Sequence, residues 1–143
     1  MRMLFDTNVV LDVLLDRQPH VESAGQIMTL VERKQIEGLL GATTVTTLHS
    51  LAAKAVGAAR ARRHLETLLT LFEIAPVDRA VLLSALGLGF PDYEDAVLHE
   101  AARHAAAVGI VTRDPAGYRK ATLHVYAPSD LLRMLRTLEG RAP

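Results

Sequence analysis

The chain opens with a short apolar run and a polar stop, Met3-Leu4-Phe5-Asp6-Thr7-Asn8. A few apolar residues that end abruptly in cap-forming side chains are typical of a buried strand followed by a turn. We therefore expect a strand over residues 3–5, with Asp6 or Thr7 capping the helix that comes next. Residues 9–15 are apolar almost without interruption, which predicts that this first helix is buried on most of its surface.

Further apolar runs alternate with helical patterns along the rest of the chain. The other expected strands cover residues 39–45, 72–77, 109–112 and 123–126. The other expected helices have apolar positions over 21–31 or cover residues 48–57, 58–71, 80–88 and 92–107, and a last helix begins at Pro128. Strands that alternate with helices predict a parallel sheet covered on both faces, so the expected fold class is α/β.

Length and composition limit the architecture and the chemistry. A chain of 143 residues has room for one domain of ordinary size, and we expect a single domain over residues 1–143. Half of the residues are hydrophobic and 22% are charged, which excludes disorder. The chain has no cysteine, so a disulfide framework, a thiolate metal site and a cysteine nucleophile are excluded.

The charges balance, with 16 basic and 16 acidic residues, so no overall field draws the chain to nucleic acid or to a membrane. Any binding to a polyanion must therefore come from a local patch or from a bound metal. Asp6 ends the first apolar run too early for a signal peptide, and the longest apolar stretch, residues 80–90, is too short to span a membrane. These features predict a soluble, cytoplasmic protein.

Acidic residues gather where the predicted strands end. Asp6 follows the first strand and Asp114 follows the fourth. The helix before the fourth strand begins with Asp92, Glu94 and Asp95. Because ligands of open α/β sheets bind outside the carboxyl ends of the strands, we expect these carboxylates at one edge. Such acids repel each other unless a cation neutralises them, and Mg²⁺ or Mn²⁺ takes oxygen ligands and keeps waters that can attack a phosphodiester.

Each of these acids also has a purely structural interpretation. Asp92 is an excellent N-cap, and Glu94 and Asp95 lie in a first helical turn, where the helix dipole favours acids. Asp6 alone can cap a helix, and Asp114 followed by proline can form a turn. The occurrence of all of them at strand ends favours metal binding over these alternatives.

Three stretches carry the motifs at strand and helix ends, LFDTNVVLD at residues 4–12, DYEDAV at 92–97 and IVTRD at 110–114. Together they resemble the PIN-domain family of metal-dependent ribonucleases. The resemblance implies a three-layer α/β/α sandwich with a central five-stranded parallel sheet, and an Mg²⁺ or Mn²⁺ site that cleaves RNA. Many bacterial members of this size are VapC-type toxins, which an antitoxin encoded beside them holds inactive.

The resemblance also implies roles for individual residues. Asp6, Asp95 and Asp114 match the first, third and fourth acids of the family, so they are expected to be catalytic and to bind the metal. Asn8 and Thr112 match polar residues that support the site. These assignments follow from the resemblance and not from spacing alone.

Two more residues are expected beside this set. Asp92 lies three residues before Asp95, shares its helix face and is expected as an additional metal ligand. Arg113 lies beside Asp114, where it can hold a phosphate or pair with a neighbouring acid.

One position departs from the family. Its second acid usually lies early in the helix after the second strand, but no carboxylate occurs between residues 39 and 59 of this chain. Thr47 is the best match to the missing position. A hydroxyl can hold a water ligand but adds no charge, so metal affinity is expected to fall and the activity to be weak, dependent on high metal, or lost. The alternative is that Thr47 is an ordinary helix residue that faces away from the site.

Other polar residues have weaker signals. The densest basic stretch either contacts RNA phosphates or is a solvated helix face, and the sequence favours neither interpretation; it comprises Lys54, Arg60, Arg62, Arg63 and His64. His99 is expected to be a packed or surface residue, although it lies one turn after Asp95. Asp12 and Asp16 are expected on a solvated helix face.

The leading hypothesis is therefore a metal-dependent endoribonuclease, with RNA as substrate and an antitoxin as partner. The alternative is a catalytically weak or inactive PIN-like module that binds RNA or protein. A phosphatase of the haloacid dehalogenase type needs an acid where the chain has Asn8, and the acidic pair of a receiver domain is absent. Apolar stretches at residues 9–15 and 80–88 point, as the family does, to a homodimer.

Overall fold

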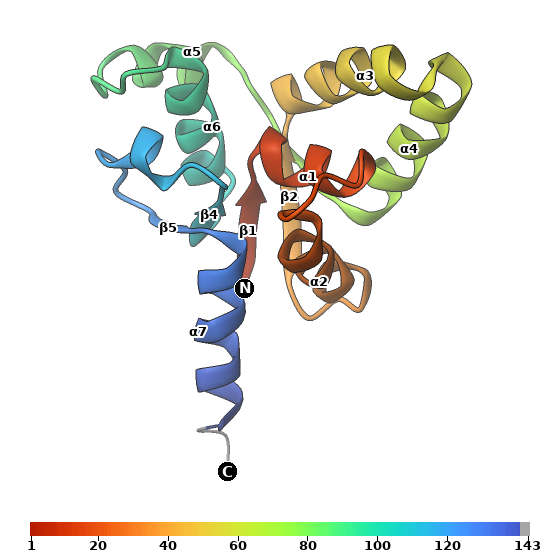
Figure 1. The fold of residues 1–143 in the computed structure, drawn as a ribbon. Coiled ribbons are helices and arrows are strands. Elements are labelled where there is room, and N and C mark those ends of the chain that lie inside the picture. Colours follow the sequence, from red (N-terminus) through yellow and green to blue (C-terminus); the bar gives the residue numbers. More distant parts are fainter. Residues whose placement is uncertain (141–143) are drawn as a thin grey trace.

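The structure, a computed structural model, describes residues 1–140 (Figure 1). Five parallel strands form one sheet in the order β3-β2-β1-β4-β5. The strands are β1 (Arg2–Phe5), β2 (Glu37–Gly41), β3 (Glu73–Ala75), β4 (Gly109–Val111) and β5 (His124–Tyr126). The sheet confirms the predicted α/β class, and the first apolar run of the sequence forms its central strand.

Neighbouring residues of the strands pack into two different cores. In β1, Met3 and Phe5 belong to one core and Leu4 belongs to the other. Leu40 and Leu39 of β2 divide in the same way. All five side chains are fully buried. Because successive side chains of a strand point to opposite faces, both faces of the sheet are covered, and this accounts for the uninterrupted apolar strands.

Seven α-helices cover the sheet within residues 1–140. They are α1 (Thr7–Leu14), α2 (Val21–Glu32), α3 (Ala42–Val56), α4 (Ala58–Leu71), α5 (Arg79–Leu86), α6 (Tyr93–His104) and α7 (Pro128–Gly140). Side chains of α5 and α6 pack into the core around Leu4, and those of the other helices pack into the core around Phe5. Figure 1 shows α5 and α6 on one side of β1 and α1 to α4 on the other, as expected for a three-layer sandwich.

The largest difference from the expected boundaries is at the end of β2. A strand over 39–45 and a threonine-rich turn were expected, but β2 ends at Gly41 and α3 begins at Ala42. Gly41 has an extended backbone (φ −65°, ψ 145°) and is itself the N-cap, so no turn separates strand and helix. The threonines lie in α3, where the hydroxyls of Thr46 and Thr47 donate to the carbonyl oxygen of Thr43.

The strand register places two polar residues side by side at the carboxyl edge of the sheet. Phe5 of β1 pairs with Val111 of β4, and the backbone N–H of Asp6 donates to the Val111 carbonyl at 2.9 Å. Asp6 and Thr112 therefore follow paired residues. A Cβ at Gly41 would lie 2.5 Å from Leu98 Cδ2, so glycine allows α6 to pack closely over the end of β2. This packing brings the N-terminus of α6 to the same edge.

The two apolar stretches that pointed to self-association differ in exposure. In the first, Val9, Val10 and Leu11 are buried in the core, so the expectation of an exposed patch is wrong there. Because the short helix α1 packs against both α2 and α3, little of its surface is free. In the second stretch, Leu83 and Leu86 of α5 are 59% and 68% exposed. Separately, none of the helices described in residues 1–140 has the length and hydropathy of a membrane span.

Candidate functional site

A cavity of about 330 Å³ opens where β1 and β4 end and α6 begins. Its lining contains most of the residues that the sequence singled out: Asp6, Thr7, Asn8, Leu11, Arg17, Thr47, Asp92, Glu94, Asp95, Leu98 and Asp114. Five carboxylates from three segments of the chain therefore border one space. We call it the carboxylate cavity.

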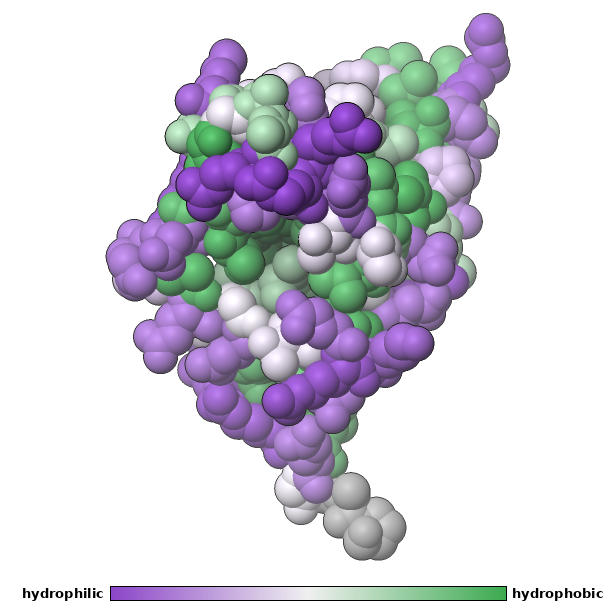
Figure 2. Space-filling model, turned by 90° about the vertical axis from the view of Figure 1, so that its right-hand side faces the viewer, coloured by the Kyte–Doolittle hydropathy of each residue, from purple (hydrophilic) through white to green (hydrophobic). Residues whose placement is uncertain are grey.

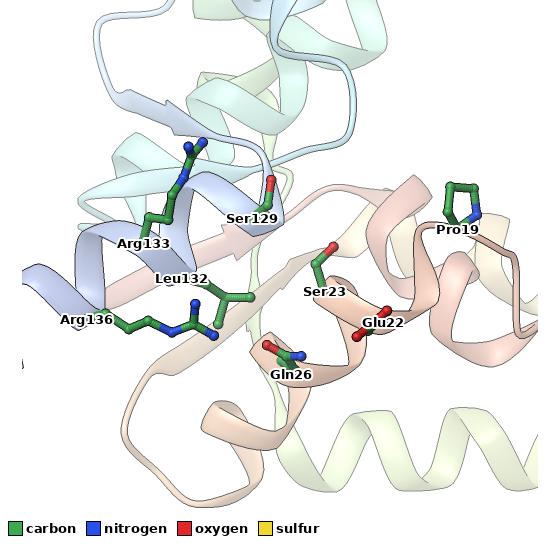
Figure 3. Close-up of a pocket in the computed structure, with 8 residues that line it drawn as sticks. All are labelled: Pro19, Glu22, Ser23, Gln26, Ser129, Leu132, Arg133 and Arg136. Atoms are coloured by element: carbon green, nitrogen blue, oxygen red, sulfur yellow. The ribbon is translucent and has the colours of Figure 1, made fainter.

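A larger hollow of about 550 Å³ lies between α2 and α7 (Figure 3). Leu132, Arg133 and Arg136 of α7 line it opposite Glu22, Ser23 and Gln26 of α2, and Figure 3 shows these side chains spread along the two helices rather than directed to one point. None of the acids predicted to bind metal lies there. The carboxylate cavity is therefore the candidate site.

Asp6 is the most completely bonded of the acids. It caps α1, with Oδ1 accepting from the Thr7 N–H at 2.7 Å. Its Oδ2 accepts from the Thr112 hydroxyl at 2.8 Å and from the Tyr118 hydroxyl at 3.1 Å. Burial raises the pKa of Asp6 above its ordinary value, these hydrogen bonds oppose the rise, and the charge of Asp114 adds to it. The capping role and the site role of Asp6 thus coexist in one side chain.

Asp95 lies in the first turn of α6, and its pKa is raised to about 7. Burial is the largest cause, and the charges of Asp6 and Asp92 add to it. The Tyr118 hydroxyl lies 3.4 Å from Asp95 Oδ1 and lowers this pKa in part. The pKa values of both acids are therefore raised mainly by burial and further by the neighbouring carboxylates.

Asp114 approaches Asp95 beside a glycine. A short 3-10 helix, η1 (Pro115–Tyr118), follows Asp114. A Cβ built on Gly117 would lie 3.0 Å from Asp95 Oδ2 and 3.4 Å from Asp114 Oδ2. Both carboxylates therefore border one small space, which stays open because residue 117 has no side chain.

Asn8, Thr112 and Arg113 connect the ends of β1 and β4. Asn8 Oδ1 accepts from the Arg113 backbone N–H at 3.1 Å, and Asn8 Nδ2 lies 3.5 Å from the Thr112 hydroxyl. That hydroxyl donates to Asp6 and accepts from the Asp114 backbone N–H at 3.1 Å. The structure thus brings both predicted supporting residues, Asn8 and Thr112, between the acids.

Thr47 lines the carboxylate cavity, so the interpretation that it faces away is wrong. Its hydroxyl donates to the Thr43 carbonyl within α3 at 3.2 Å. The neighbouring Thr44 is buried and pairs with the Thr7 hydroxyl at 3.1 Å. This side of the cavity therefore offers hydroxyls and no carboxylate.

Asp92 and Glu94 are exposed at the rim of the cavity. Asp92 is the N-cap of α6 and accepts from the Glu94 N–H at 2.8 Å. Its structural interpretation is therefore correct, and its second oxygen stays free of hydrogen bonds from the described residues. Asp92 is one turn away from Asp95, as the spacing predicted.

The donor set fits a hard divalent cation in part. Within residues 1–140, no group of three or more Asp, Glu, His or Cys side chains is arranged to hold a metal ion by itself. Mg²⁺ is usually bound through one or two carboxylates and keeps several waters, so a complete protein cage is not required. The oxygen-only donors, the open space at Gly117 and the raised pKa values of Asp6 and Asp95 suit such an ion.

Several predicted features lie elsewhere. His99 is packed, as expected: Nδ1 lies 2.8 Å from Glu100 Oε2, and Nε2 accepts from the Thr122 N–H at 3.1 Å. The basic residues of α4 are mostly exposed, with Arg62 paired to Glu66, and none of them lines the cavity. Helices α3 and α4 lie on the face that Figure 2 presents, where hydrophilic side chains alternate with hydrophobic patches.

Sequence reasoning was wrong about Asp12. It was expected on a solvated helix face, but it is 1% exposed and pairs with Arg113, whose Nε lies 3.1 Å from Asp12 Oδ2. The error arises because α1 is buried on most sides and leaves no solvated face. Asp16 is exposed, beyond the end of α1.

Tyr118, Gly117 and Arg17 were missed. Tyr118 is 2% exposed and contacts two of the acids. An aromatic residue four positions after Asp114 carries no motif of its own, and a glycine between them is typical of any turn. The only sequence signal for Gly117 and Tyr118 was their place a few residues after a predicted strand end, and Arg17 had no comparable signal.

Comparison with known proteins supports the assignment of the fold. A family model described as a PIN domain matches residues 2–116. No curated protein sequence matches the chain. The solved structure of VapBC2 from Rickettsia felis bound to a promoter DNA fragment is 15% identical, with a TM-score of 0.70 over 89% of this chain and 98% of that chain.

Two further solved structures are similar. A toxin–antitoxin complex from Klebsiella pneumoniae is 21% identical, with a TM-score of 0.68 over 88% of this chain and 97% of that chain. VapC20 of Mycobacterium tuberculosis, a toxin that cleaves the sarcin–ricin loop, is 12% identical, with a TM-score of 0.60 over 76% of this chain and 86% of that chain. At these identities the likeness shows the fold alone.

Proposed function

Because the chain belongs to the PIN-domain family, we propose that it is a metal-dependent endoribonuclease that hydrolyses RNA phosphodiesters in the carboxylate cavity. The observation that carries the proposal is the convergence of Asp6, Asp95 and Asp114 from three segments around Tyr118 and Gly117. Within the described residues, no histidine lines this cavity to act as a general base. The chain has no cysteine nucleophile.

Each residue of the carboxylate cavity has its own role in this proposal. A bound Mg²⁺ or Mn²⁺ would lower the pKa of a coordinated water and offset the negative charge that develops at phosphorus. Asp95 and Asp114 would hold the cation beside Gly117, with Asp6 next to them and Asp92 at the rim. The hydroxyls of Thr112 and Tyr118 donate to Asp6 and fix its orientation. Asn8 holds the backbone at Arg113 and so places Asp114.

The protein is further proposed to be the toxin of a toxin–antitoxin pair. The similarity to VapBC2 and to the Klebsiella toxin–antitoxin complex supports an antitoxin as partner. A cysteine-free protein that acts on RNA fits the reducing cytoplasm. We also propose that residues 1–143 form a single domain.

A homodimer is proposed through α5. Leu82, Leu83 and Leu86 are 39%, 59% and 68% exposed, and Tyr93 beside them is 45% exposed. Together with Val77, Asp78 and Arg79 they line a hollow of about 390 Å³. A contiguous exposed apolar surface of this kind often marks a site of contact with another protein.

A second candidate function is a PIN-like module with weak or no catalysis that binds RNA or protein. The specific observation that favours it is the absence of an acid on the α3 side of the cavity, where Thr47 lies. Metal binding and RNA cleavage measured together separate the two candidates.

The test is cleavage of single-stranded RNA by the purified chain with Mg²⁺, with Mn²⁺ and with chelator. We expect cleavage only with metal, and a loss of orders of magnitude for Asp6→Asn and Asp95→Asn, each of which keeps the side-chain shape but removes a charge. Asp16→Asn, at an exposed position outside the cavity, is the control. Undiminished cleavage by folded Asp6→Asn and Asp95→Asn proteins would refute the mechanism.

A further inference from the structure

Asp12 is a buried carboxylate that faces two arginines beside the carboxylate cavity. It is 1% exposed. Arg113 Nε lies 3.1 Å from Asp12 Oδ2, and Arg17 Nη1 lies 4.0 Å from Asp12 Oδ1. Oδ1 has no hydrogen-bond partner within the described part of the chain. One carboxylate thus lies between two cations and is closer to Arg113 than to Arg17.

The two arginines come from different segments and share the counterion Asp12. Arg17 follows α1 and lines the cavity, and of the lining residues in the described chain it is the one basic side chain. Arg113 directly precedes Asp114. Their side chains are 41% and 37% exposed, whereas Asp12 is buried. Two cations and one anion leave one positive charge at this place.

We propose that Arg17 and Arg113 form a phosphate-binding pair that holds a backbone phosphate of the RNA next to the bond that is cut. The inference rests on the proposed ribonuclease function and names residues that bind its substrate. A guanidinium group presents its donors in the planar geometry that phosphate oxygens accept. The single excess charge of the pair with Asp12 offsets the single charge of a phosphodiester.

The position of Asp12 explains why these two arginines suit the role. A surface arginine loses side-chain entropy when it binds a phosphate. The ion pair of Arg113 with Asp12, at 3.1 Å, already restricts that side chain, so less freedom is lost there. The unbonded Oδ1 leaves Arg17 free to turn its donors to a ligand without leaving the neighbourhood of its counterion.

The basic residues of α4 are the other place for phosphate contacts. Arg62 also has a carboxylate partner, Glu66, at 3.1 Å, but it is 81% exposed. No residue of α4 lines the carboxylate cavity. A phosphate bound there would not be aligned with the acids, whereas a phosphate held by Arg17 lies in the same cavity. Arg17 lines the cavity and Arg113 shares its counterion Asp12, so the geometry favours this pair over the residues of α4.

The experiment measures binding of a fluorescent single-stranded oligoribonucleotide by anisotropy, in Mg²⁺, with Asp95→Asn added to every protein to prevent cleavage. Arg17→Ala and Arg113→Ala are each expected to weaken binding by about tenfold, the effect of one hydrogen bond to a charged group. Each is expected to lower the salt slope by about 0.7, as for one lost contact to a single strand. Arg62→Ala, which breaks a similar ion pair, is the matched control and is expected to bind like the parent.

The double variant tests whether both arginines hold one phosphate. If they do, its loss of affinity is smaller than the product of the two single losses, because each contact depends on the other. If Arg113→Ala fails to fold, Arg17→Ala carries the test, since Arg17 makes no hydrogen bond to Asp12 and is partly exposed. Independent, fully multiplicative losses would overturn the shared phosphate.

The remaining outcomes are distinguishable from failure of the proposed function. If the parent binds and the native chain cleaves RNA, but Arg17→Ala and Arg113→Ala match the parent, the phosphate-binding pair is overturned and the ribonuclease stands. If the native chain neither binds nor cleaves the oligoribonucleotide, both fall. If the arginine variants lose binding of an oligo-glutamate peptide as strongly as binding of RNA, the pair is a site for acidic protein and the RNA assignment is overturned.

Discussion

Replacing Tyr118 by phenylalanine removes one hydroxyl from the centre of the carboxylate cavity and leaves the ring in place. Tyr118 is 2% exposed, and its hydroxyl lies 3.1 Å from Asp6 Oδ2 and 3.4 Å from Asp95 Oδ1. The ring packs edge-on against Phe90, with 6.0 Å between centroids, and this contact needs no hydroxyl. Tyr118→Phe therefore isolates the hydrogen bond from the packing.

The expected loss of stability follows from the partners of that hydroxyl. A hydrogen bond to a charged group contributes about 1.5–3 kcal/mol. Asp6 Oδ2 keeps its bond from Thr112, so we expect the lower end, about 1.5 kcal/mol, at pH 8 without metal. For a chain of this length the melting temperature then falls by about 3–6 °C. At pH 5 Asp95, whose pKa is about 7, is protonated, so the part of the loss that comes from the bond to Asp95 decreases.

The same substitution affects metal binding. The Tyr118 hydroxyl lowers the pKa values of both Asp6 and Asp95, so phenylalanine raises them further. Protons then compete better with Mn²⁺, and the midpoint pH of Mn²⁺ binding moves upward. The assays are thermal unfolding in chelator and calorimetric titration of Mn²⁺ at pH 6, 7 and 8.

Tyr93→Phe is the matched control, because its hydroxyl donates to the Leu82 carbonyl at 2.8 Å at an exposed position outside the cluster of acids. It is expected to leave Mn²⁺ binding unchanged. If Tyr118→Phe is as stable as the parent at pH 8 and binds Mn²⁺ with the same pH dependence, the reasoning about the Tyr118 hydroxyl is refuted.

Four further predictions follow from the same geometry. Without metal, the raised pKa values of Asp6 and Asp95 mean that the folded state binds more protons than the unfolded state. The free energy of unfolding therefore falls as pH rises from about 4 to about 7. Urea unfolding that shows no such fall in the parent, or an equal fall in Asp95→Asn, contradicts this prediction. Thr47 lines the cavity, so Thr47→Glu is expected to lower the Mn²⁺ concentration needed for half-maximal binding. Thr46 is the exposed residue directly before it in α3, and Thr46→Glu is expected to leave that concentration unchanged. Gly117→Ala places a methyl group about 3 Å from Asp95 Oδ2 and weakens Mn²⁺ binding, while Gly25→Ala, with open space around it, leaves it unchanged; equal titrations of both contradict the role of Gly117. Leu86→Lys on α5 reduces the mass in light scattering from dimer to monomer and Leu69→Lys, similarly exposed on α4, does not; a parent that is already monomeric refutes the dimer.

The sequence predicted the architecture because its clearest pattern, the short apolar runs, follows directly from the burial of the strands on both faces. Strands buried on both faces must be apolar at consecutive positions, and the run at Met3 to Phe5 could only end where a polar edge begins. The N-cap Asp92 was predictable from local sequence as well, because an acid directly before a helical pattern can accept from a free N–H group of its first turn. The end of β2 was not predictable, because threonine is favoured in strands and turns but is tolerated in α3.

The acids of the cavity were predictable as a group, whereas their supports were not. Strand ends and helix starts locate Asp6, Asp95 and Asp114 from local sequence alone. Tyr118 and Asp12 act through partners more than 100 positions away in the chain, Asp6 and Arg113 respectively, and only the folded chain brings these pairs together. The space between Asp95 and Asp114 stays open because residue 117 has no side chain, and no pattern of residue types predicts such a space.

The missing acid and the buried tyrosine bear on the same quantity, the charge of the cavity. Under the proposed function a carboxylate on α3 would raise metal affinity, but without a cation it would add repulsion around Asp95, whose pKa is already about 7. Thr47 contributes no charge, and Tyr118 donates a hydrogen bond that stabilises the acids present. Under the proposed function, the cavity therefore offers a cation less charge than a site with the full set of acids. Its activity should depend on metal concentration more steeply than that of a site with the full set of acids, so titrating Mg²⁺ against cleavage rate is the measurement that decides between a working ribonuclease and a binding module.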